Sequence, residues 1–125
     1  MTQARDLAGQ RVLLVEDEAM ITLLLEDMLG DLGCEVVGPA DTVDSAMALA
    51  AGETPIDIAV LDVNLAGRQI YDVADTLRAK GVPIVFSSGY GAGRLREVDQ
   101  GAPVLGKPFR QQDLAAALRR ALAPQ

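Results

Sequence analysis

The feature that most constrains the fold is a regular alternation of short apolar runs with longer segments of helical periodicity. Five such runs occur along the 125-residue chain, at Val12–Val15, Val36–Val37, Ile58–Leu61, Ile84–Phe86 and Val104–Leu105. Each gap between consecutive runs has room for one helix and two short loops. Strand–helix alternation repeated in this way predicts a parallel sheet with helices on both faces.

The segments that follow these runs have the apolar spacing of amphipathic helices. The stripes that we expect to be buried are Ile21, Leu24, Leu25, Met28 and Leu32; Val43, Ala46, Met47 and Ala50; Ile70, Val73, Ala74 and Leu77; and Leu114, Leu118 and Leu122. The segment Arg94–Gln100 is the weakest of the five expected helices, because Leu95 and Val98 give it only a partial stripe.

Five strands are too few for an eight-stranded barrel, so the predicted sheet is open. We expect an α/β fold, a flavodoxin-like (βα)5 three-layer sandwich with a parallel sheet of order 2-1-3-4-5. Open sheets of this kind bind ligands at the carboxyl ends of their strands, where the strand order reverses. Function is therefore read from the residues that directly follow each strand.

Composition excludes several classes of chemistry. The chain has no histidine and one cysteine, Cys34, so it has no histidine base, no internal disulfide and no multi-thiolate metal site. Its net charge of −7 and its four aromatic residues argue against nucleic-acid binding. No apolar stretch predicts a membrane span or a signal peptide, and we expect a cytoplasmic protein with no membrane partner.

Polar side chains stand at four strand ends of the predicted sheet. They are Glu16 and Asp17 after the first strand, Asp62 and Asn64 at the third, Ser88 at the fourth and Lys107 after the fifth. Taken singly, each has an ordinary structural explanation, such as a helix cap, a turn residue or a solvated surface charge. Together they bring three carboxylates, one hydroxyl and one ammonium to a single edge of the sheet.

That combination indicates phosphoryl chemistry. Crowded carboxylates repel one another unless a cation is present, and ligands that are all oxygen select a hard cation such as Mg²⁺. Asp62, on the central strand, is the candidate nucleophile, because carboxylates can form aspartyl-phosphates. Lys107 would neutralise charge on the phosphoryl group, and the Ser88 hydroxyl would donate a hydrogen bond to it.

At these residues the chain resembles the receiver domain of bacterial two-component response regulators. Four motifs carry the resemblance, which extends from Arg11 to about Ala123: Val12–Glu18, Asp57–Leu65, the strand end at Ser88, and Lys107-Pro108-Phe109. The resemblance implies that Asp62 is phosphorylated and that Lys107 pairs with the phosphoryl group. It also implies that Mg²⁺ is held by Glu16, Asp17, Asp62 and the backbone carbonyl of Asn64, and that Ser88 is the switch hydroxyl, with Ser87 as the competing candidate.

Two departures from the usual receiver pattern carry information. Val104 stands where receivers usually have an aromatic residue, and Ala66 replaces a frequent proline. The run Phe86–Gly91 resembles a subgroup of often single-domain receivers in which the fourth strand ends in Phe-Ala-Thr-Gly. We therefore expect Gly89, Gly91 and Gly93 to let the loop after this strand act as the switch.

The resulting prediction is an N-terminal extension over residues 1–10 and a receiver domain over residues 11–123, with no output domain. Its phosphoryl donor would be a sensor histidine kinase or a histidine phosphotransfer protein. Phosphorylation would change binding of a downstream protein through the fourth helix, fifth strand and fifth helix. The domain would act as a signalling module and not as a turnover enzyme.

Two alternatives come from other classes of protein. A Mg²⁺-dependent phosphatase of the haloacid dehalogenase type also uses an aspartate nucleophile, but it needs a second aspartate where this chain has Asn64. A flavodoxin-like electron carrier would need a phosphate-binding loop after the first strand, where Glu16, Asp17 and Glu18 would repel a phosphate.

Overall fold

The five apolar runs form one parallel sheet. A computed structural model describes residues 7–65, 68–89 and 95–123, and the strand order is β2-β1-β3-β6-β7. The strands are β1 (Arg11–Val15), β2 (Glu35–Ala40), β3 (Ile58–Asp62), β6 (Ile84–Ser88) and β7 (Val104–Gly106). All four neighbouring pairs are parallel. Within this sheet, β6 and β7 are the fourth and fifth strands along the chain, so the strand order is 2-1-3-4-5 and the predicted topology is confirmed.

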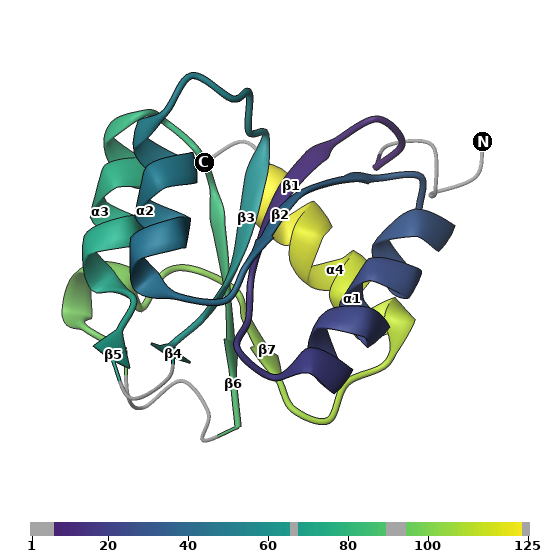
Figure 1. Cartoon of the computed structure of the whole chain (residues 1–125). Helices are drawn as coiled ribbons and strands as arrows, with labels where there is room; N and C mark the ends of the chain where they lie inside the picture. The colour runs from purple at the N-terminus through teal and green to yellow at the C-terminus, as the bar shows by residue number, and fades with distance from the viewer. Residues whose placement is uncertain (1–6, 66–67, 90–94, 124–125) are drawn as a thin grey trace.

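In the part of the chain that the structure describes, four α-helices cover the two faces of this sheet. They are α1 (Ala19–Asp31), α2 (Val43–Ala51), α3 (Tyr71–Ala79) and α4 (Gln111–Leu122). Helices α2 and α3 lie on one face and α1 and α4 on the other, which gives the three layers seen in Figure 1. No helix among residues 7–65, 68–89 and 95–123 is long and apolar enough to cross a membrane.

The core has two halves, one under each pair of helices, because successive strand residues point to opposite faces. Val12 and Leu14 of β1 pack with α1 and α4, whereas Leu13 and Val15 pack with α2 and α3. Every residue of β3 is buried. Burial on both faces explains why the strands read as continuous apolar runs and do not alternate with polar residues.

The predicted fourth helix is wrong. Over its described part, residues 95–100, this segment forms only a three-residue 3₁₀ helix, η3 (Glu97–Asp99). Leu95, just before η3, is buried, and Val98 is 61% exposed. The partial stripe could not bury a full helical face, and Gly101 and Pro103 follow within a few residues, which favours an early end. A small antiparallel hairpin that was not predicted, β4 (Asn64–Leu65) with β5 (Arg68–Gln69), follows β3.

The helical stripes are otherwise mostly placed as predicted, with one exception in α1. Leu24 is 41% exposed there, and Leu29 is buried in its stead.

At the N-terminus, Leu7 is buried in the half of the core formed by α1 and α4, and the backbone N–H of Gly9 donates to the carbonyl of Gly33. Cys34 is buried, and burial raises the pKa of its thiol, so it behaves as a small core residue.

Candidate functional site

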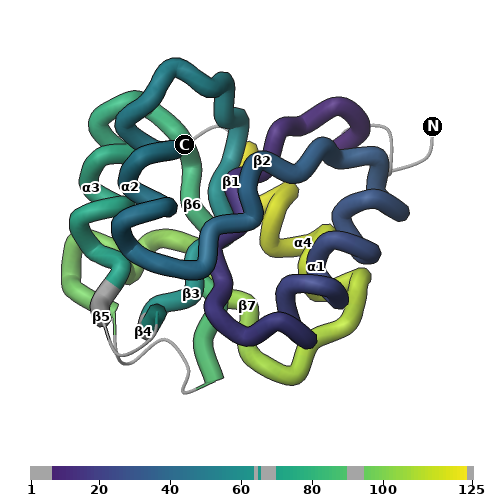
Figure 2. The backbone as a smooth tube through the Cα atoms, viewed as in Figure 1, coloured from purple at the N-terminus to yellow at the C-terminus, as the bar shows by residue number. Residues whose placement is uncertain are grey.

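The topology gathers four strand ends at one edge of the sheet. This edge is toward the bottom of the view in Figure 2. Strand β1 ends at Val15, directly before Glu16 and Asp17, and β3 ends on Asp62. Strand β6 ends on Ser88, and β7 ends one residue before Lys107. Since β1, β3, β6 and β7 are consecutive neighbours in the sheet, the polar groups at their ends face one common region.

Three carboxylates form an acidic cluster at this edge. Each of Glu16, Asp17 and Asp62 offers one carboxylate oxygen, and these oxygens all lie within 4.8 Å of one another. Glu16 and Asp62 are buried, whereas Asp17 is exposed. Carboxylates this close destabilise one another unless positive charge lies between them, and burial strengthens the repulsion.

Lys107 supplies positive charge to the two buried carboxylates. Its Nζ atom donates a hydrogen bond to Asp62 Oδ2 at 3.3 Å and lies 3.0 Å from Glu16 Oε1. Burial by itself lowers the pKa of Lys107, but the carboxylates of Glu16 and Asp62 outweigh it and raise that pKa above its ordinary value. The ammonium therefore stays charged at neutral pH.

Glu16 is held in place from two directions. Its Oε2 atom accepts a hydrogen bond from the backbone N–H of Glu18 at 3.1 Å, while Oε1 faces Lys107. Burial raises the pKa of Glu16, and Lys107 and the Glu18 N–H offset part of that rise. A buried carboxylate with a raised pKa is a group whose charge a further cation would stabilise.

The donor set fits a hard divalent cation. Its side-chain ligands are carboxylate oxygens from the ends of β1 and β3, which suit Mg²⁺ better than softer metals. The backbone of Asn64 begins β4, two residues after Asp62, at the same end of β3. A site with a few protein oxygens leaves further coordination positions for water and for a phosphoryl oxygen.

The two serines at the end of β6 lie on opposite faces of the sheet. Ser87 is paired in register with Asp62 and Leu105, and Ser88 with Gly106. Both are buried, and the carbonyl of Ser88 accepts a hydrogen bond from the backbone N–H of Lys107 at 3.1 Å. The hydroxyl of Ser87 is buried with no hydrogen-bond partner among the described residues.

Gly89 is exposed, and Gly91 and Gly93 of the predicted switch loop lie outside the described residues.

Sequence reasoning missed two features beside this site. Glu18 lies 3.9 Å from Lys107 and orients Glu16 through its backbone, a role that the acidic run of three residues could have suggested. The first turns of α1 expose three large apolar side chains, Met20, Leu23 and Leu24. Helical periodicity does not reveal this patch. It shows which apolar residues share a face of the helix, but it does not show whether another part of the protein covers that face.

Comparisons with known proteins agree with the fold. A family model, the response regulator receiver domain, matches residues 12–119. The transcriptional regulatory protein PdtaR of Mycobacterium tuberculosis is 36% identical over 126 residues, covering 98% of this chain and 61% of PdtaR. The phyllosphere-induced regulator PhyR of Methylorubrum extorquens is 32% identical, covering 95% of this chain and 45% of PhyR. The chain thus spans less than two thirds of the length of these relatives.

Solved structures give the same result. The solution structure of SdrG from Sphingomonas melonis Fr1 has a TM-score of 0.81 and 37% identity, and the match covers 98% of this chain and all of SdrG. The response regulator PhyR from Brucella abortus has a TM-score of 0.77 and 30% identity, over 92% of this chain and 48% of that one.

These matches leave the haloacid dehalogenase alternative without support. The solved structures that match share the overall fold of this chain, including its parallel sheet. From Val12 to Arg119 the chain therefore belongs to the response regulator receiver family, and it is a phosphoacceptor domain of two-component signalling.

Proposed function

We propose that Asp62 accepts a phosphoryl group from a phosphohistidine on a sensor kinase or a histidine phosphotransfer protein, in the presence of Mg²⁺. The observation that carries this proposal is the position of Asp62. It is buried at the end of the central strand, its Oδ2 atom lies 3.3 Å from Lys107 Nζ, and two further carboxylates lie beside it. The result of phosphorylation is altered binding to other proteins, not turnover of small phosphoesters.

The chemistry requires a donor outside this chain. A carboxylate oxygen of Asp62 attacks phosphorus, the bond from phosphorus to the donor imidazole breaks, and the bonding electron pair stays with the imidazole nitrogen. This chain has no histidine, so the phosphohistidine belongs to the partner. Lys107 neutralises charge on the transferred group, and the Ser88 hydroxyl is proposed to donate a hydrogen bond to it.

Mg²⁺ would be held by Glu16, Asp17, Asp62 and the backbone carbonyl of Asn64. When bound, it supplies positive charge against the phosphoryl oxygens. The crowding of three carboxylates within 4.8 Å supports this assignment, because the single ammonium of Lys107 leaves the cluster with excess negative charge.

The exposed start of α1 is the proposed docking surface for the phosphoryl donor. Met20, Leu23 and Leu24 are 77%, 60% and 41% exposed, and α1 begins directly after the acidic run at the site. An apolar patch beside the phosphoacceptor suits a helix that carries the phosphohistidine, because packing there brings the two reacting groups together. The downstream protein is proposed to bind η3, β7 and α4.

Intact mass spectrometry tests the proposal. Incubation with acetyl phosphate and Mg²⁺ is expected to add one hydroxylamine-sensitive phosphoryl group, and EDTA should prevent the addition. Asp62→Asn should abolish it. The matched control is Asp41→Asn, an exposed aspartate that follows β2 at the same edge of the sheet. Labelling of Asp62→Asn at the wild-type level would refute the assignment of Asp62.

A further inference from the structure

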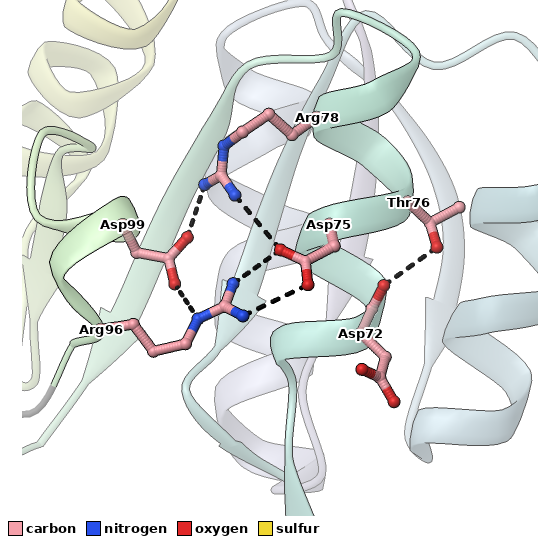
Figure 3. A network of polar contacts seen from close by, with 6 residues as sticks. All are labelled: Asp72, Asp75, Thr76, Arg78, Arg96 and Asp99. Carbon is pink, nitrogen blue, oxygen red and sulfur yellow. Dashed lines mark hydrogen bonds and ion pairs between the residues drawn. The ribbon is translucent and has the colours of Figure 1, made fainter.

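Two arginines and two aspartates connect η3 to α3. We call Asp75, Arg78, Arg96 and Asp99 the Arg–Asp network (Figure 3). Asp75 and Arg78 belong to α3, Asp99 ends η3, and Arg96 directly precedes it. The four side chains thus connect the segment after β6 to a helix on the α2–α3 face of the sheet.

Asp99 is the buried centre of the network. Its side chain is fully buried, its Oδ1 atom lies 2.5 Å from Arg78 Nη2, and its Oδ2 atom accepts a hydrogen bond from Arg96 Nε at 2.7 Å. A buried carboxylate needs such partners, because an unpaired charge in the interior is strongly unfavourable. Asp99 therefore fixes both guanidinium groups in place.

Arg96 is the member that connects the most partners. Besides Asp99, it donates two hydrogen bonds to the carboxylate of Asp75, at 2.8 and 3.2 Å. Its guanidinium also lies 4.3 Å from the centre of the Tyr71 ring, at the start of α3. The Asp75 side chain is 53% exposed, so water reaches its contacts with both Arg96 and Arg78, the latter at 3.5 Å.

The backbone of this segment gives it little independent stability. A 3₁₀ helix of three residues has poorer hydrogen-bond geometry than an α-helix and does not persist alone. Its backbone hydrogen bonds include Asp99 N–H to the Arg96 carbonyl and Gln100 N–H to the Glu97 carbonyl. Its position on α3 therefore depends on the buried Leu95 side chain and on the Arg–Asp network.

We propose that the Arg–Asp network is a clamp that holds residues 95–99 on α3 in the unphosphorylated protein and opens when Asp62 is phosphorylated. The segment that the clamp holds forms the short η3 among the described residues where a full helix was expected, and it begins seven residues after Ser88, the proposed switch hydroxyl. This regulatory role rests on the proposed function, whereas the clamping of residues 95–99 does not. A state with the clamp open is favoured by any change that weakens the closed one.

Hydrogen exchange of Asp75→Asn tests the clamp. Asp99 is unsuitable for this test, because its side chain is fully buried and its replacement would disturb the core beneath η3 as well as the network. Loss of the exposed ionic contact is expected to speed exchange at the amides of Asp99, Gln100 and Ala102 by about fivefold, with α1 unchanged. The matched control is Asp72→Asn, one turn earlier on α3, whose carboxylate points away from the network in Figure 3.

Adding Mg²⁺ and beryllofluoride, a phosphoryl mimic, tests the regulatory role. The mimic should speed exchange of the same amides in the wild type and add little in Asp75→Asn, which should also bind the mimic more tightly. Unchanged exchange in Asp75→Asn would refute the clamp, and full protection of residues 95–99 in the mimic-bound wild type would refute its opening. A wild type that does not bind the mimic would refute the proposed function and the regulatory role together, while the comparison without mimic still decides the clamp.

Discussion

The ammonium of Lys107 donates a hydrogen bond to Asp62 Oδ2 at 3.3 Å and at the same time lies 3.0 Å from Glu16 Oε1. One side chain from the end of β7 thereby neutralises buried carboxylates from the ends of both β1 and β3. In this position the ammonium can contact a phosphoryl group on Asp62, and it also competes with a divalent cation for the same oxygens.

Replacement of Lys107 should therefore separate phosphoryl transfer from metal binding. We expect Lys107→Met to slow phosphorylation by acetyl phosphate about 100-fold, because a charge aimed at the transferred group is lost. Mg²⁺ affinity, measured by calorimetry, should stay the same or increase. Lys80→Met is the matched control, since the ammonium of Lys80 donates a hydrogen bond to the carbonyl of Gly52 at 2.8 Å and belongs to none of the groups of the acidic cluster. Loss of Mg²⁺ binding in Lys107→Met would instead show that Lys107 supports the fold of the site.

Substitution of the two serines of β6 should distinguish their roles. The hydroxyl of Ser87 is buried without a hydrogen bond among the described residues, so Ser87→Ala should leave the free energy of unfolding unchanged or raise it by up to about 1–2 kcal/mol. Ser88→Ala should still be phosphorylated on Asp62 but should lose the phosphorylation-dependent change in hydrogen exchange. The reverse result would make Ser87 the switch hydroxyl.

The strands and the strand ends could be predicted because local sequence determines them. The runs at Val12–Val15 and Ile58–Leu61 are apolar because both faces of the sheet are covered, and sheet order then brings Asp62 and Lys107 to one edge. The contact between Arg78 and Asp99 could not be predicted in this way. It joins residues 21 positions apart in regions with no shared periodicity, so only the tertiary structure reveals it. The contacts of Asp99 with Arg78 and Arg96 also attach η3 to α3, although η3 is too short to bury a full helical face.

Two glycines should respond oppositely to alanine. Gly38 has a φ of +97°, and a Cβ atom there would lie 2.9 Å from the backbone nitrogen of Ala40, so Gly38→Ala should destabilise the fold by at least about 1–2 kcal/mol. Gly30 lies within α1 with open space around it, so Gly30→Ala should stabilise by about 0.5–1 kcal/mol. Urea unfolding of both variants measures the difference, and equal effects would contradict the backbone geometry at Gly38.

The pairing of Arg11 with Asp57 should make part of the stability depend on pH. The backbone N–H and the guanidinium of Arg11 donate to the Asp57 carboxylate at 2.7, 3.0 and 3.1 Å, and these bonds lower the pKa of Asp57 below its ordinary value. A lowered pKa means that the unfolded chain binds a proton more readily than the folded one. The stabilisation is therefore complete at neutral pH and declines as the pH falls through the ordinary pKa toward the lowered one.

We expect Asp57→Asn to cost about 1 kcal/mol at pH 7, because the pair is partly exposed and one backbone hydrogen bond is weakened. The difference from the wild type should shrink below about pH 5. Urea unfolding at a series of pH values measures it, with Asp41→Asn as a control whose small effect should not vary. A difference that stays constant down to the lowest pH at which both proteins fold would show that the charge of Asp57 contributes nothing and that only its shape and hydrogen bonds matter.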